Sequence, residues 1–170
     1  MGQLANNAKR SMKTISYSFD NVGGVAGIIA IPIEVFNRLA PVFGTDTFHV
    51  SVSSSDNIIE IPVLWDDSFS FSEVESDEEA GRLFKIDIKG KIPRQDADGS
   101  IIRTLEYGRW IVMCQDRNGC IRAAGTRLVP MQFASGRTMG GNSAANGNAF
   151  SFFNQQERPS ELVLDTLIFE

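Results

Sequence analysis

The sequence predicts a mainly β fold, a small β-barrel or a β-sandwich, with one or two short helices and extended polar loops. Many short segments alternate apolar and polar side chains, as half-buried strands do. Fifteen glycines and six prolines indicate frequent turns between these segments. Roughly eight to ten short strands in one chain are typical of sandwiches and barrels.

The clearest single element is a hairpin over residues 108–126, with Asn118-Gly119 at its tip. An Asn-Gly pair between two strand-like runs favours a two-residue type I′ turn. With that turn, Cys114 lies opposite Ala123, and Cys114 and Cys120 point to opposite faces. We therefore expect two reduced packing residues rather than a disulfide. The predicted apolar face holds Trp110, Val112, Cys114, Ile121, Ala123 and Gly125.

Residues 1–13 are polar and predict a loose N-terminal arm, followed by a single β-rich domain over residues 14–170. Thr14–Phe19 alternates and Val25–Ile31 is a continuous apolar run, so both are predicted strands. A proline then opens Ile33–Leu39, which favours two helical turns with proline at the first position. A strand through the same residues is the alternative.

Thr47–Val52 alternates and predicts a strand, with His49 on its polar side. This histidine is either a general base or an exposed strand residue. Because no nucleophile or paired carboxylate accompanies it, we expect the exposed strand residue. Ile58–Trp65 is the predicted returning strand, and Pro62 within it indicates an edge position or a bulge.

Ser68–Ser72 alternates again and leads into the acidic stretch Glu73–Glu79. Clustered carboxylates suit a divalent cation, but the stretch lacks the alternating aspartates and fixed glycine of an EF-hand. We therefore predict a solvated loop or short helical turn there. Asp96 and Asp98, in the loop Gln95–Ser100, resemble part of a calcium loop without its bidentate glutamate. We interpret them as turn residues.

Arg82–Pro93 is the next predicted strand, and its alternating charges mark one exposed face. A short helix is predicted over Ile101–Tyr107, with Ser100 as its cap and Gly108 as its end.

Ala134–Asn148 is rich in glycine, asparagine and serine and predicts a mobile loop, ordered by a partner. Its glycines do not have the spacing of a dinucleotide fingerprint or a P-loop. Phe150–Phe153 and Glu161–Phe169 are predicted strands, separated by the loop Gln155–Ser160. The last of them has no polar tail, so we expect it to be needed for strand pairing.

Composition limits the classes of function. A net charge of −5 without a basic block does not indicate general affinity for nucleic acid. One histidine and two cysteines do not make a zinc site. Residues 1–13 lack the apolar region of a secretory signal, and residues 25–43, the most apolar window, carry charges and prolines. We expect synthesis in the cytoplasm and no membrane span.

No candidate catalytic, cofactor-binding or metal-binding residue emerges from these patterns. Nucleophilic catalysis needs a Ser, Cys or Thr with a base held nearby, and the chain offers no convincing pair. Paired-carboxylate hydrolysis stays open, because spatial pairs of Asp and Glu are invisible in a sequence. We predict a non-enzymatic binding or assembly protein without cofactors.

From Leu83 onward, the order of parts resembles virion proteins from the tail or neck modules of bacteriophages that infect gut Bacteroides-like bacteria. The resemblance covers about the C-terminal half. The matching parts are a charged strand, Ile92-Pro93, a short helix, Arg109-Trp-Ile-Val112, Asp116-x-Asn-Gly119, Ala124-Gly-Thr126, a polar Gly/Asn loop and Asn146-Gly-Asn-Ala-Phe-Ser-Phe152. The acidic stretch and the Phe-rich end have no counterpart in any one component.

This resemblance implies a structural subunit of a ring or tube in the virion, made in the host cytoplasm. Its partners would be further copies of the chain and other virion proteins, and an acidic wall would suit a passive conduit for DNA. The alternative is a β-sandwich module that binds carbohydrate or peptide, with Trp65, Trp110 or the Phe-rich end as a stacking platform. A small carboxylate-dependent hydrolase is the third hypothesis.

Overall fold

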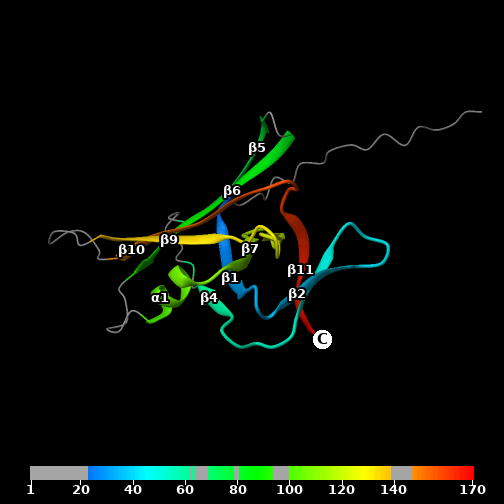
Figure 1. Ribbon diagram of the computed structural model, residues 1–170, viewed down its shortest axis with the longest axis horizontal. Coiled ribbons are helices and arrows are strands. Elements are labelled where there is room, and N and C mark those ends of the chain that lie inside the picture. The colour runs from blue at the N-terminus through cyan, green and yellow to red at the C-terminus, as the bar shows by residue number, and fades with distance from the viewer. Residues whose placement is uncertain (1–22, 62, 64–68, 79–80, 94–99, 139–146) are drawn as a thin grey trace, which may run out of the picture.

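The computed structural model describes residues 23–61, 63, 69–78, 81–93, 100–138 and 147–170. Within these residues the chain forms two β-sheets and one short helix (Figure 1). Both sheets are open and neither closes into a barrel. The predicted mainly β fold is confirmed, and the two open sheets match its sandwich alternative.

The larger sheet has seven strands and contains both the predicted hairpin and the last strand of the chain. Neighbouring strands are antiparallel except β3 and β11, which are parallel. Because β11 lies between β3 and β8, the prediction that the last strand is needed for pairing is confirmed. In spatial order the strands are β2 (Phe36–Pro41), β3 (Phe48–Val52), β11 (Glu161–Phe169), β8 (Ile121–Ala124), β7 (Trp110–Asp116), β1 (Val25–Pro32) and β4 (Ile59–Ile61).

The smaller sheet has four antiparallel strands. The described residues contain one helix, α1 (Ser100–Tyr107), which packs against β9 (Gln132–Thr138) of this sheet. There the Ser135 hydroxyl donates to the Glu106 carboxylate at 2.6 Å. Gly108 ends the helix, with its N–H donating to the carbonyl of Thr104, as predicted. In spatial order the strands are β5 (Ser70–Glu78), β6 (Gly81–Pro93), β10 (Gly147–Gln156) and β9 (Gln132–Thr138).

The main core contains residues from both sheets. Successive residues of β7 point to opposite faces, so Trp110 and Val112 belong to this core while Ile111 and Met113 belong to a second cluster. The four-stranded sheet and the residue just before β5 contribute a chain of aromatic contacts with ring centroids 5.0–5.9 Å apart. Its members are Phe69, Phe133, Phe150 and Phe152. Trp110 is 1% exposed, which confirms that it is a core residue and not a stacking platform.

The hairpin of β7 and β8 exists, but its predicted register is wrong by one residue. Cys114 lies opposite Arg122 and not Ala123. The tip is a three-residue loop in which Gly119 alone takes the positive φ angle, at 86°. The Asp116 carboxylate accepts the N–H groups of Asn118 and Cys120 at 2.9 and 2.8 Å, which stabilises this longer turn.

The changed register moves Ile121 and Ala123 to the face predicted to be mixed. They pack there with Ile111 and Met113 in the second cluster. The large sheet is therefore apolar on both faces of this hairpin.

Three further predictions of local structure are wrong. Ile33–Leu39 is not a helix: a turn follows β1 and the chain re-enters the sheet as β2. The acidic stretch is neither loop nor helical turn, because its residues through Glu78 pair with β6 as part of β5. The stretch 134–148 is not a loop at its two ends, since residues 134–138 belong to β9 and residues 147–148 to β10, and residues 139–146 lie outside the described residues.

Other predicted strands are confirmed, among them β1, β3, β6 and β11. The returning strand is confirmed in part, as the short edge strand β4. Several predictions lie outside the described residues: the arm 1–13, the strand Thr14–Phe19, Pro62, Trp65, Glu79, and the loop residues Asp96 and Asp98.

Candidate functional site

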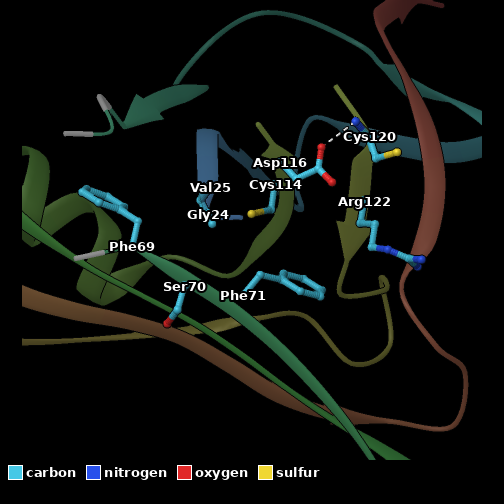
Figure 2. Close-up of a pocket in the computed structure, with 9 residues that line it drawn as sticks. All are labelled: Gly24, Val25, Phe69, Ser70, Phe71, Cys114, Asp116, Cys120 and Arg122. Atoms are coloured by element: carbon cyan, nitrogen blue, oxygen red, sulfur yellow. Dashed lines mark hydrogen bonds between the residues drawn. The ribbon is translucent and has the colours of Figure 1, made fainter. Parts of the chain in front are cut away.

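A pocket lies at one end of the space between the two sheets and has a volume of about 490 Å³. This is within the range of roughly 300–1,000 Å³ for pockets that hold small ligands. Figure 2 shows two phenyl rings on one side and the side chains of β7 and β8 on the other. Its lining residues are Gly24, Val25, Phe69, Ser70, Phe71, Cys114, Asp116, Cys120 and Arg122.

The pocket has an apolar floor and a polar mouth. Val25, Phe69 and Cys114 are buried and form the floor. Cys120 and Arg122 are exposed and lie at the mouth. An apolar group fits this floor, because burial there would remove it from water. The mouth carries charges of both signs, since Asp116 and Arg122 both line the pocket.

The position of one wall of the pocket depends on Gly90, because two phenyl rings pack directly against its backbone. A Cβ atom on Gly90 of β6 would lie 2.6 Å from the Phe69 ring and 2.7 Å from the Phe150 ring. Only a residue without a side chain allows both rings to pack against the strand. Gly90 thus determines where Phe69 stands, and Phe69 lines the pocket.

A short chain of hydrogen bonds joins the two sheets beside the pocket. The N–H of Ser160 donates to the Glu73 carboxylate of β5 at 2.7 Å. Arg122 of β8 donates to the carbonyl and hydroxyl oxygens of Ser160 at 3.3 and 3.4 Å. Ser160 is buried, so these bonds lie partly protected from water. Glu73, predicted as part of a solvated acidic loop, is therefore a structural residue that holds the sheets together.

Both cysteines line this pocket, so the prediction that they point to opposite faces is wrong. Each is a free thiol; Cys114 is buried and Cys120 exposed. Burial, with a smaller effect from the negative charge of Asp116, raises the pKa of the Cys114 thiol to about 12. Cys114 is consequently protonated at neutral pH and is not a thiolate nucleophile.

The other candidates from the sequence lie apart from the pocket. His49 is half-buried in β3, and its Nδ1 atom has no hydrogen-bond partner among the described residues. Of the acidic stretch, Glu75 and Asp77 lie within 2.6 and 4.0 Å of Arg82 on the neighbouring strand. Within the described part of the chain, no three His, Cys, Asp or Glu side chains are grouped so that they could hold a metal ion.

Sequence reasoning missed the pocket itself. Its walls come from four separate stretches, and their juxtaposition depends on how the sheets stack. The local signal was the alternation that places Phe69 and Phe71 on one side of a strand, together with the cysteines and Arg122 of the hairpin. The one-residue error in the predicted hairpin register concealed the pocket, because that register placed Cys114 and Arg122 on different faces of the sheet.

Comparison with family models, curated proteins and solved structures gives no match. The eight-residue helix α1 is far too short to cross a membrane, and the described residues contain no helix that could do so.

Proposed function

We propose that this chain is a non-enzymatic structural subunit of a bacteriophage tail or neck that assembles into a ring or tube. The order of parts in the C-terminal half suggests the virion, and one observation supports assembly. Phe43, at the tip of the β2–β3 hairpin, is fully exposed, at 103% of its reference area. Aromatic side chains are enriched at protein–protein interfaces, so a phenyl ring held in water at a projecting tip is suited to a contact with another molecule.

The tip is shaped by its own hydrogen bonds, which also supports a contact role. Val42 and Thr47 are joined by a backbone bond of 3.0 Å, and the hydroxyls of Thr45 and Thr47 lie 2.7 Å apart. Gly44 takes a positive φ of 78°, as such a tight turn requires. A loop already in one conformation loses little entropy on binding.

The partners in this proposal are copies of the same chain and other virion proteins. Subunits of rings and tubes associate through heterologous interfaces, in which two different surfaces of one chain meet. Made in the host cytoplasm, the subunits would take their place in the virion, where an acidic strand such as β5 would suit the wall of a DNA conduit.

The test is the state of association of the full chain. Size-exclusion chromatography with light scattering, followed by negative-stain microscopy, is expected to show oligomers whose mass rises with concentration, and rings or short tubes. A strictly monomeric protein at high concentration, with no rings on the grid, would contradict the proposal.

The pocket favours a second candidate, a β-sandwich module that binds carbohydrate or peptide. Phe71 is half-buried at the pocket wall and could stack on a sugar ring. A glycan array would test this. Reproducible binding that is abolished by Phe71→Ala would favour the module, and an array without signal would count against it.

A further inference from the structure

The projecting hairpin and the pocket are complementary features of one chain. The hairpin tip presents Phe43 to solvent, and the pocket offers a buried apolar floor without an aromatic occupant from the described residues. Phe43 is fully exposed, so its ring is not covered by any of the residues that the structure describes. A second copy is the simplest source of a partner for each feature.

The two features lie on different parts of the molecule. The pocket is built on β1, the start of β5, β7 and β8, while β11 lies between β8 and the β2–β3 hairpin in the large sheet. Figure 1 shows the β2–β3 hairpin extending away from the body beyond β11. A contact between a tip and the pocket of the next copy would therefore leave one tip and one pocket free, and the contact could repeat.

Charge and size agree with this pairing. Asp46, three residues after Phe43, is exposed on the same tip. Arg122 is exposed at the mouth of the pocket, where its Nη1 atom donates to Ser160 and the other donors of the guanidinium can face a carboxylate. The carboxylate that lines the pocket, Asp116, accepts the N–H groups of Asn118 and Cys120. A volume of about 490 Å³ accommodates a phenyl ring and part of the turn that carries it.

We infer that the tip of the β2–β3 hairpin of one copy inserts Phe43 into the pocket of the next copy, with Asp46 facing Arg122. The interface is heterologous, so its repetition builds a closed ring or an open tube, according to the rotation between copies. This inference rests on the proposed assembly function and names the surfaces that carry it.

The first experiment compares self-association of the wild-type chain and of Phe43→Ser by sedimentation velocity. Removal of the central aromatic anchor is expected to weaken association by roughly 10- to 100-fold. Leu128→Ser is the matched control, because Leu128 is 93% exposed in a different connection. It is expected to associate like the wild type. Circular dichroism melts show that each variant is folded.

The second experiment uses the protein's own thiol at the pocket mouth. Asp46→Cys places a thiol on the tip, and a short bis-maleimide would join it to Cys120 of the next copy. A ladder of dimers, trimers and longer species is expected, because each chain carries one tip and one pocket. Adding Cys120→Ser is expected to abolish the ladder, whereas tip-to-tip contacts would leave a dimer. Cys114 does not compete, since it is buried and protonated.

The outcomes separate the two proposals. If the wild type forms oligomers but Phe43→Ser associates equally well and no ladder forms, the tip-in-pocket contact is overturned and assembly stands. If the wild type is monomeric at every concentration, the assembly function itself is contradicted, and the contact with it. A Phe43-dependent oligomer with a Cys120-dependent ladder supports both.

Discussion

Two hairpins of the large sheet have similar local chemistry and opposite surroundings. Each turns on a glycine with positive φ, Gly119 at 86° between β7 and β8 and Gly44 at 78° between β2 and β3. The first hairpin begins at Trp110, which is 1% exposed, and the second carries Phe43, which is 103% exposed. Turn chemistry sets the conformation of a hairpin, whereas its position in the sheet decides whether its aromatic residue stabilises the fold or is free for a partner.

The largest expected difference is between the two aromatic residues. Trp110→Ala removes a buried ring and the hydrogen bond of 2.9 Å from its Nε1 to the Leu105 carbonyl. We expect a loss of about 3–5 kcal/mol in the free energy of unfolding. Phe43→Ala is expected to change it by no more than about 0.5 kcal/mol. Urea unfolding at low protein concentration measures both, and a large loss for Phe43→Ala would break the comparison.

The two turn glycines should behave alike. Gly119→Ala and Gly44→Ala each force a side chain into the left-handed region, at an expected cost of roughly 1–2 kcal/mol. No described atom lies within 4 Å of either added Cβ, so the cost is backbone strain and not a clash. Gly136→Ala, in β9, is the control: it has the same open space without a positive φ. A loss for Gly136→Ala equal to the other two would show that strain is not the cause.

The thiols of the pocket should react at very different rates. Raising the pKa of Cys114 from 9.0 to about 12 lowers its thiolate fraction near neutral pH roughly 1,000-fold. In Cys120→Ser, Ellman's reagent is therefore expected to react far more slowly than in Cys114→Ser. Rapid labelling of Cys120→Ser under native conditions would contradict the burial of the pocket floor.

Cys114 also makes stability depend on pH. Its pKa is higher in the folded state than in the unfolded state, so the neutral thiol favours folding. This contribution is complete below about pH 9 and is lost as the pH rises towards about 12. Unfolding of Cys114→Ser over the same range should lack this loss.

The smallest expected effect is a change in the pKa of the Glu170 side chain, which forms hydrogen bonds at the surface beside the edge strand β2. Hydrogen bonds from Ser51 and then Arg38 hold the pKa of the Glu170 side chain below its usual range. Ser51→Ala should raise that pKa towards its ordinary value, as seen by NMR titration. Because a lowered pKa stabilises the folded state only while the carboxylate is charged, this contribution disappears as the pH falls through the folded pKa. An unchanged titration would show that the bond does not persist in solution.

Local patterns predicted most of the β structure, and errors arose where tertiary contacts override them. Alternation identified β3 and β6 correctly, and each of them pairs with a neighbour on both sides in its sheet. The Asn-Gly pair indicated the hairpin but not its register, since Asp116 stabilises a turn that is one residue longer. The acidic stretch resembled a solvated loop, yet β6 pairs with it throughout Ser70–Glu78.

The candidate site was less predictable than the fold. The pocket brings together β1, the start of β5, and the β7–β8 hairpin, which are far apart in the sequence. The bond from Ser160 to Glu73 spans 87 positions, and no sequence pattern marks it. Phe43 stands in the sequence between Pro41 and Gly44, which indicates a turn, but only the arrangement of the sheet leaves its ring uncovered.

Sedimentation velocity of the wild type and Phe43→Ser, at matched concentrations, tests the central claim most directly. The wild type is predicted to sediment as species larger than a monomer, with a weight that rises with concentration, while folded Phe43→Ser sediments as a monomer under the same conditions. Identical oligomers from both proteins would contradict the claim that this tip carries assembly.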